Sequence, residues 1–301
     1  MTSQAGKFTR TEGGLRAFLS DCLQLGKPRI TTMVIVSTML GFVLASPGPL
    51  NMRVFWFMVL GTALVSWGIH ALNQYMERDL DGVMPRTMNR PLPTGRMRPE
   101  PVLYWGIVVA LAGLAVLFLL CNLVSGLVGT AVVVLYVLVY TPMKRVSPLN
   151  TLVGAVPGAL PPVLGWAAAT GGLDIRALNL FLIMFIWQLP HFLPIAWLYR
   201  NDYRRANLPM LTARDPEGHR LKRMQVIYTI ALVVVSLGPT WLGMTGTIYL
   251  VGALALGVGF LAASLWLATH LSDINARMVL KVSVIYLPLL LGLLVYDTRA
   301  F

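Results

Sequence analysis

Long apolar stretches alternate with short polar segments along most of the chain. Nine apolar stretches can be distinguished, at residues 30–45, 54–74, 101–120, 126–140, 151–169, 178–198, 224–243, 248–269 and 279–295. A transmembrane helix needs about 20 residues, so most of these stretches are long enough to cross a bilayer, although the first and fourth are short. Their apolar residues run continuously, which favours helices over barrel strands. The pattern predicts an all-α, polytopic membrane protein, a bundle of about nine transmembrane helices.

The composition supports this class. Of the 301 residues, 56% are hydrophobic and only 12% are charged, whereas soluble domains carry about 25% charged residues. We expect residues 1–29 to form a polar N-terminal segment, residues 30–296 a single transmembrane domain and residues 297–301 a short C-terminal tail. The first apolar stretch reads as a retained span and not as a cleaved signal peptide.

The basic residues are distributed unequally between the two ends of the predicted bundle. Of the 24 Lys and Arg residues, 21 fall in the N-terminal segment and in every second loop, and only Arg53, Arg176 and Arg299 fall on the other side. The positive-inside rule then places the N-terminus and the long loops in the cytoplasm and the C-terminus outside the cytoplasmic membrane. This bias also accounts for the net charge of +12 without a nucleic-acid partner.

A polar motif follows directly after the second apolar stretch. Asn73, Glu77 and Asp81 are spaced four residues apart. At 100° per residue, they lie within about 80° of one another on one helix face, whereas Asp79 lies on the opposite side. Ionisable residues at the end of a membrane helix are costly and indicate function.

The same motif carries two basic residues, Arg86 and Arg90. Oxygen ligands beside arginines suit a phosphate bound through Mg²⁺, which usually takes one or two carboxylates and completes its shell with phosphate oxygens and water. The motif therefore predicts a magnesium-dependent phosphate site. The sequence lacks the glycine-rich nucleotide loops that ATP-driven transport would need.

A second polar segment interrupts the sixth apolar stretch. His191 stands between Pro190 and Pro194, and Asp202 follows in the next loop. Proline removes a helix hydrogen bond, so the span is expected to kink or unwind there. Irregular backbone at membrane depth usually lines a cavity. His191 is therefore a candidate cavity residue, although a structural hydrogen-bonding role remains open.

The fourth and fifth apolar stretches are joined by a short basic loop. The loop begins with Tyr140 and contains Lys144 and Arg145, which could reach a phosphate held by the first motif. The next stretch, residues 154–166, is rich in Gly and Pro and ends at Trp166. Such a helix packs closely or bends to leave room for a ligand. Both motif-bearing spans deliver acids and arginines to one side, which suggests two halves facing one cavity.

These motifs resemble those of the UbiA-type intramembrane prenyltransferases. The family pattern Asn-x3-Asp-x3-Asp followed by Arg-x3-Arg-Pro-Leu-Pro-x-Gly is matched from Asn73 to Gly95, with Glu77 in place of the middle Asp. The segments at residues 140–150, 157–166 and 188–211, with 27–29 at the first span, are similar to the branch of the family that uses haem. In many relatives the second motif has two acids four residues apart, but here Ala206 takes the place of the second.

The resemblance implies transfer of a farnesyl group from farnesyl diphosphate to a vinyl group of haem B, with addition of water, giving haem O. It implies Mg²⁺ on Asn73, Glu77, Asp81 and Asp202. Diphosphate would lie on Arg86, Arg90, Lys144 and Arg145. His191, Tyr140 and Trp166 would line the haem-binding part of the cavity. A haem A synthase or a terminal oxidase would receive the product. Two alternatives remain open: an aromatic quinone precursor as the prenyl acceptor, and a haem carrier or transporter without catalysis.

Overall fold

The computed structural model describes residues 14–213 and 215–300, and within these ranges it contains helices and no strands. The first half of the chain comprises α1 (Gly14–Leu25), α2 (Pro28–Leu44), α3 (Met52–Val83), α4 (Pro99–Val116), α5 (Leu123–Val133), α6 (Thr141–Met143) and α7 (Asn150–Thr170). Short π-helical segments, Leu117–Cys121 and Val134–Tyr140, continue α4 and α5. The second half comprises α8 (Ile175–Leu198), α9 (Arg200–Arg205), α10 (His219–Ser236), α11 (Gly238–Trp241), α12 (Thr247–Thr269) and α13 (Asp273–Ala300).

The prediction of a helical membrane bundle is confirmed. Eight helices of the described chain are long and apolar enough to cross a membrane, and the pair α1–α2, bent by 50°, makes a ninth candidate. The bend falls at Lys27, whose backbone is left-handed (φ 46°), and Pro28 then starts α2. Proline is favoured in the first turn of a helix because its missing N–H has no partner to lose there.

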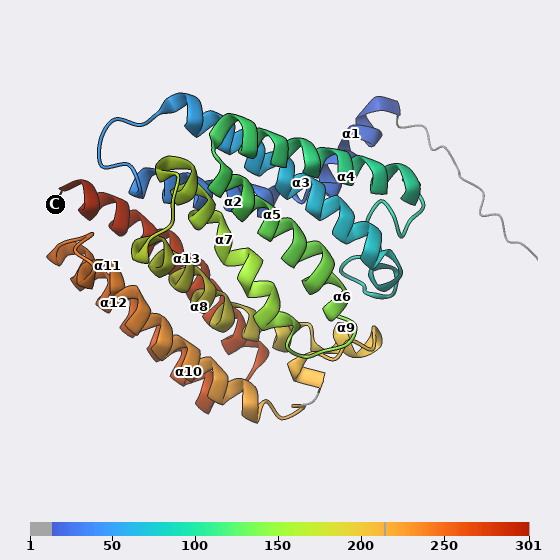
Figure 1. The fold of residues 1–301 in the computed structure, drawn as a ribbon. Helices are drawn as coiled ribbons and strands as arrows, with labels where there is room; N and C mark the ends of the chain where they lie inside the picture. Colours follow the sequence, from blue (N-terminus) through green and yellow to red (C-terminus); the bar gives the residue numbers. More distant parts are fainter. Residues whose placement is uncertain (1–13, 214, 301) are drawn as a thin grey trace, which may run out of the picture.

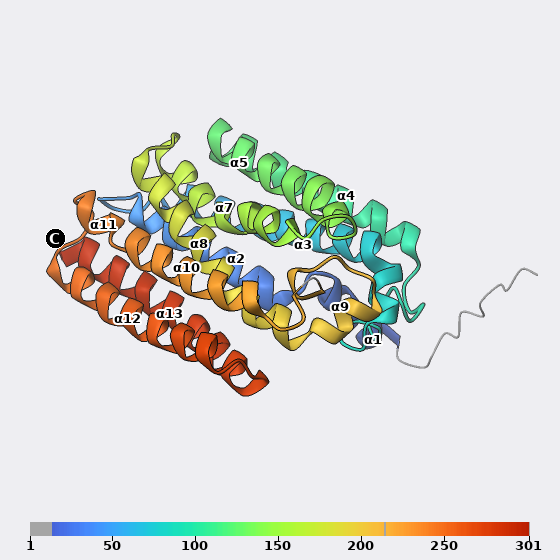
Figure 2. The ribbon, with the colours of Figure 1, turned by 90° about the horizontal axis from the view of Figure 1, so that it is seen from below.

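The long helices run side by side, and short helices connect them at both ends. In both ribbon views α1 and α9 lie at the end opposite to the C-terminus, where Figure 1 also shows α6, whereas α11 lies near the C-terminus (Figures 1 and 2). The end with α1, α6 and α9 is the one that carries the basic loops of the sequence. Of the predicted terminal segments, residues 1–13 and 301 lie outside the described residues, whereas α1 falls within the N-terminal one and α13 extends through Ala300.

The core consists of two large hydrophobic clusters. One is built mainly from α3 and α7, and the other mainly from α8, α10, α12 and α13. The division agrees with the expectation of two halves. The joint between them brings α7 against α8.

The predicted unwinding at His191 is wrong, because α8 is a continuous helix through both Pro190 and Pro194. Tertiary packing encloses the segment that the prolines weaken, because α8 is packed against α7, α10 and α13. Gln188 Nε2 on α8 donates to the Ala155 carbonyl at 3.0 Å and so ties the helix to α7. Packing against neighbouring helices helps prolines to be tolerated in membrane helices.

Close packing of α2 against α7 requires glycine on both helices. A Cβ on Gly41 would overlap the Pro162 carbonyl oxygen, and a Cβ on Gly165 would overlap that of Thr38. We expect Gly165→Ala to lower the free energy of unfolding by ~1–3 kcal/mol, because overpacking forces backbone shifts. The melting temperature in detergent measures the effect.

The matched control is Gly259→Ala in α12, where a Cβ would meet no atom within 4 Å. This change is expected to be neutral or mildly stabilising, because alanine has the higher helix propensity. Equal melting temperatures for the two variants would contradict the packing argument.

Candidate active site between the two halves of the bundle

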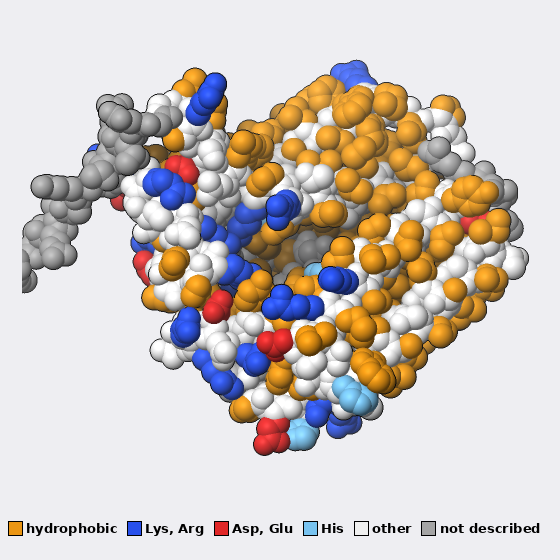
Figure 3. All heavy atoms as spheres, turned by 180° about the vertical axis from the view of Figure 1, so that it is seen from behind, with side chains coloured by type: hydrophobic (Ala, Val, Ile, Leu, Met, Phe, Trp, Pro, Cys, Tyr) orange, Lys and Arg blue, Asp and Glu red, His pale blue; other side chains and the backbone are white. Residues whose placement is uncertain are grey.

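A cavity of about 750 Å³ lies between the two hydrophobic clusters. Helices α2, α3, α7 and α8 supply most of its wall. Figure 3 shows it as a hollow at the surface, with basic side chains gathered along its rim and apolar side chains around the rest. Its volume is in the range of small-molecule sites, about 300–1,000 Å³.

The three predicted oxygen ligands share one buried face of α3. Asn73, Glu77 and Asp81 are all buried, and the two carboxylates line the cavity. The side chain of Asp79 is 72% exposed and lies 4.0 Å from Arg78. The helical-wheel prediction is therefore confirmed for all four residues.

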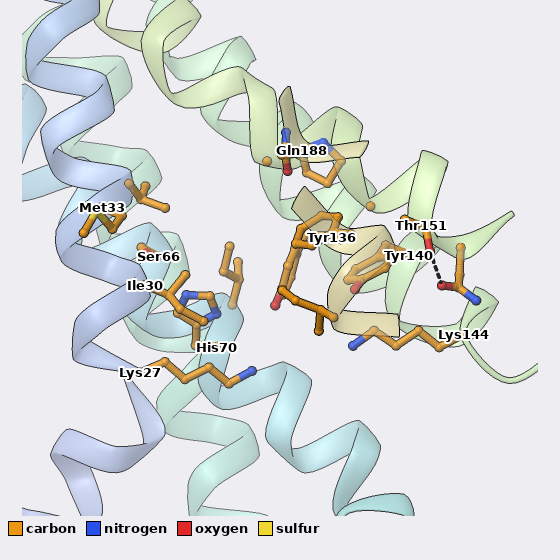
Figure 4. A pocket seen from close by; sticks show the side chains of 18 of the residues that line it. Lys27, Ile30, Met33, Ser66, His70, Tyr136, Tyr140, Lys144, Thr151 and Gln188 are labelled. Carbon is orange, nitrogen blue, oxygen red and sulfur yellow. Dashed lines mark hydrogen bonds between the residues drawn. The ribbon is translucent and has the colours of Figure 1, made fainter. Parts of the chain in front are cut away.

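Each of the three oxygen-bearing side chains is met by a different cation. Lys27 Nζ donates to Asn73 Oδ1 at 2.7 Å. Lys144 Nζ lies 2.6 Å from Glu77 Oε1, and Arg90 Nη1 donates to Asp81 Oδ2 at 2.6 Å. The cations come from three separate segments, and Figure 4 shows Lys27 and Lys144 reaching toward one another from opposite walls. The arrangement concentrates charge at one end of the cavity.

Positive charge is in excess at this end. Five basic side chains line the cavity but only two acidic ones, a surplus of three; the basic residues are Lys27, Arg29, Arg86, Arg90 and Lys144. Such crowding of cations is unfavourable in the free protein, so an anion of several charges would bind strongly.

Local structure holds these cations in place. The Lys144 ammonium lies 4.5 Å from the centre of the Tyr140 ring, and the Arg86 guanidinium lies 5.0 Å from that of Tyr199. Asn73 Nδ2 donates to Thr141 Oγ1 at 3.2 Å, which ties α3 to α6. The loop after α3 is fixed by a hydrogen bond of 3.0 Å from Thr87 Oγ1 to the Asp81 carbonyl. The site is therefore organised before any ligand enters it.

Four of the predicted site residues lie outside the cavity wall. Among the described residues, the wall does not include Asn73, Arg145, Trp166 or Asp202. Arg145 is exposed and donates to the Met76 carbonyl at 2.8 Å. Trp166 is buried in the hydrophobic cluster of the second half. Asp202 is half-buried on α9. The structure thus removes Arg145 and Trp166 from the cavity, and it leaves Asp202 as a predicted ligand outside the cavity wall.

Other lining residues were not among the predicted site residues. Lys27 and Arg29 lie at the start of α2, in the segment that resembles the family but was given no role in binding. His70 on α3 is buried, and its ring meets Tyr136 edge-on at 5.7 Å. The predicted residues Tyr140 and His191 do line the cavity. His191 extends into it from α8 and is stacked on Trp187.

The donors on α3 fit magnesium with a bound phosphate. Among the described residues, no three His, Cys, Asp or Glu side chains converge into a self-sufficient metal site. Two carboxylates and an amide oxygen on one face, beside a surplus of cations, agree with the preference of Mg²⁺ for a few protein ligands completed by phosphate oxygens and water.

The chain is similar to proteins that transfer prenyl groups. Residues 34–285 match the UbiA prenyltransferase family. A protoheme IX farnesyltransferase of Solibacter usitatus is 44% identical over 93% of this chain and 99% of that protein. A digeranylgeranylglyceryl phosphate synthase has the same fold, with a TM-score of 0.80 at 15% identity over 94% of this chain and 99% of that chain. A UbiA homologue from Archaeoglobus fulgidus, solved with GPP and Mg²⁺, has a TM-score of 0.62 at 15% identity over 91% and 99%.

Proposed function

The chain belongs to the UbiA prenyltransferase family, and from this premise we propose that it transfers a farnesyl group from farnesyl diphosphate to a vinyl group of haem B, with addition of water, giving haem O. The observation that carries the proposal is the division of one cavity into a cationic end, beside the oxygen ligands of α3, and a largely apolar remainder. A relative with this activity in its name matches nearly the whole chain.

The cationic end is assigned to the diphosphate. Asn73, Glu77 and Asp81 would hold Mg²⁺, which neutralises the diphosphate and makes it a better leaving group. Asp202 is proposed as a further ligand from the sequence resemblance alone. Arg86, Arg90 and Lys144 bind the remaining phosphate oxygens, and we add Lys27 to this group because its ammonium lies against Asn73.

The ion pairs of the free site exchange partners when substrate binds. Arg90 and Lys144 now neutralise Asp81 and Glu77. With metal on the carboxylates, the two cations are free to turn toward the diphosphate. Their attraction grows as the leaving group gains charge, so they stabilise the transition state more than the bound substrate.

The apolar remainder of the cavity is assigned to the farnesyl chain and the porphyrin. The allylic cation formed on ionisation must be kept from water until it meets the vinyl carbon. The face of Tyr140 lies beside the cationic end and can stabilise a carbocation by ~0.5–2 kcal/mol. Water then captures the new cation on the porphyrin side chain, and a proton is lost.

The protein is a multi-pass membrane protein, and we propose the cytoplasmic membrane as its location. The excess of basic loops at the end with α1, α6 and α9 would place that end, and the diphosphate site with it, in the cytoplasm. The C-terminus would then lie outside. Residues 30–296 are proposed to act as one domain, and haem O would pass to a haem A synthase or a terminal oxidase.

The direct test is incubation of the purified protein with haem B and farnesyl diphosphate, followed by mass analysis of the extracted haem. We expect haem O in the presence of Mg²⁺ and its loss when EDTA is added, because the diphosphate would then keep its charge. Transfer to a quinone precursor in place of haem would favour another acceptor. Haem binding without any product would indicate a carrier.

A further inference from the structure

The two ring nitrogens of His191 have different surroundings. Nδ1 lies 2.8 Å from the Oγ of Ser283 on α13. Nε2 has no hydrogen bond recorded among the described residues, and the ring lines the cavity. This asymmetry is informative because the partner of one nitrogen decides whether the other carries a proton.

The hydroxyl of Ser283 fixes the direction of this hydrogen bond. Ser283 Oγ donates to the Leu280 carbonyl within α13 at 2.7 Å. A serine hydroxyl has one proton to donate and two lone pairs to accept with. Since that proton is used on Leu280, Oγ accepts from His191, and Nδ1 carries the hydrogen. In the neutral ring, Nε2 then presents a lone pair to the cavity.

Trp187 holds the ring in this orientation. Its Nε1 donates to the Ser283 carbonyl at 2.9 Å, and its ring stacks on His191 with centroids 4.7 Å apart and planes 19° apart. The two residues stand one turn apart on α8 and share Ser283 as partner. The histidine therefore cannot rotate without breaking the stack and its hydrogen bond.

An unprotonated imidazole nitrogen can make only one of two kinds of haem contact. A propionate is an acceptor and needs a donor hydrogen, which Nε2 in this tautomer lacks. Iron needs a lone pair, and metal-binding histidines usually donate their other N–H to a neighbouring acceptor. The nearby lining residues Met184, Phe192 and Leu287 are apolar and suit a porphyrin face.

We propose that Ser283 positions His191 so that its Nε2 ligates the iron of haem B inside the cavity. This inference rests on the proposed function, because it takes haem B as the substrate. Ser283 is then a positioning residue that acts through His191. Ligation fixes one porphyrin face against α8 during farnesyl transfer.

The test is a haem titration of the purified protein followed by absorption and resonance Raman spectra. In the wild-type protein we expect a histidine-ligated spectrum. His191→Ala should lose it, with at least ~10-fold weaker haem binding, and added imidazole should restore the ligated spectrum. His191→Gln, which can still bond to Ser283, should lose ligation while keeping the melting temperature.

Ser283→Ala provides the sharper measurement. In this variant His191 Nδ1 loses the hydroxyl to which it donates, and this loss should weaken haem affinity by ~10–100-fold. It should also move the iron–histidine stretching band of the ferrous form, because Nδ1 no longer donates to serine. The control is Ser264→Ala, which removes a buried hydroxyl bonded to Gln225 and Thr229 on α10 and is expected to leave the haem spectrum unchanged.

Two outcomes would overturn the inference. If His191→Gln keeps the wild-type haem spectrum but binds haem more weakly, the result would indicate that His191 contacts a propionate. Unchanged affinity and spectrum, with a lower melting temperature, would indicate a histidine that only joins α8 to α13. Haem O formation without histidine ligation would refute the inference and keep the proposed function. Histidine ligation without haem O formation would support the inference and refute the proposed function.

Discussion

Replacement of Asp81 by asparagine is expected to lower farnesyl transfer by ~100-fold or more, because a carboxylate that would hold magnesium on the leaving diphosphate is lost. Asp81 is 1% exposed, and its Oδ2 accepts a hydrogen bond of 2.6 Å from Arg90. Asparagine keeps the shape of the side chain but removes the charge that would hold magnesium. Haem O formed per minute at saturating substrate measures the effect.

The matched control is Asp79→Asn, two residues away on the same helix. The Asp79 side chain is 72% exposed and has only a weak contact with Arg78. Exposed ion pairs contribute about 0–1 kcal/mol, so activity should stay within about twofold of the wild-type rate. Melting temperatures in detergent separate loss of activity from loss of folding. Greater damage from Asp79→Asn would refute the assignment of the α3 face.

The α3 face could be predicted because its geometry is local. Residues four apart on a helix share a side, so the spacing of Asn73, Glu77 and Asp81 fixes their relative direction. The membrane spans were equally accessible, because apolar length is read directly from the chain. In both cases the evidence lies within one segment.

The partners of that face could not be predicted, since they depend on how distant segments fold together. Lys27 reaches Asn73 from 46 residues away, after the bend between α1 and α2. Nothing in the motif containing Asn73 indicates this approach. Ser283 lies 92 residues from His191, and its role is visible only when α8 and α13 are packed.

Predictions from local sequence were wrong where packing between helices overrides local preference. Prolines weaken an isolated helix, but α8 stays helical because it is packed against α7, α10 and α13. Trp166 belongs to a segment rich in Gly and Pro, as a cavity wall would require, yet its ring turns into the core. The composition of a segment does not say which way each side chain faces.

Replacement of Lys144 by alanine is expected to lower kcat/KM for farnesyl diphosphate by about 100-fold, through a higher KM and a lower kcat. The Lys144 ammonium lies 2.6 Å from Glu77 and 4.5 Å from the Tyr140 ring centre, at the cationic end of the cavity. Its removal leaves the buried Glu77 without a partner, so magnesium should also stabilise this variant against heat more than the wild type. Steady-state rates at varied farnesyl diphosphate and fixed haem measure the main effect.

The adjacent Arg145 supplies the control, because it has the same charge and a different location. Its guanidinium is exposed and donates to the Met76 carbonyl at 2.8 Å, so Arg145→Ala loses one surface hydrogen bond. Such a bond is worth about 0.5–1.5 kcal/mol of stability, and the kinetic constants should stay within about twofold of the wild type. Equal kinetic losses in the two variants would show that charge near the loop matters and position does not. A change in the haem dependence alone would move Lys144 out of the diphosphate site.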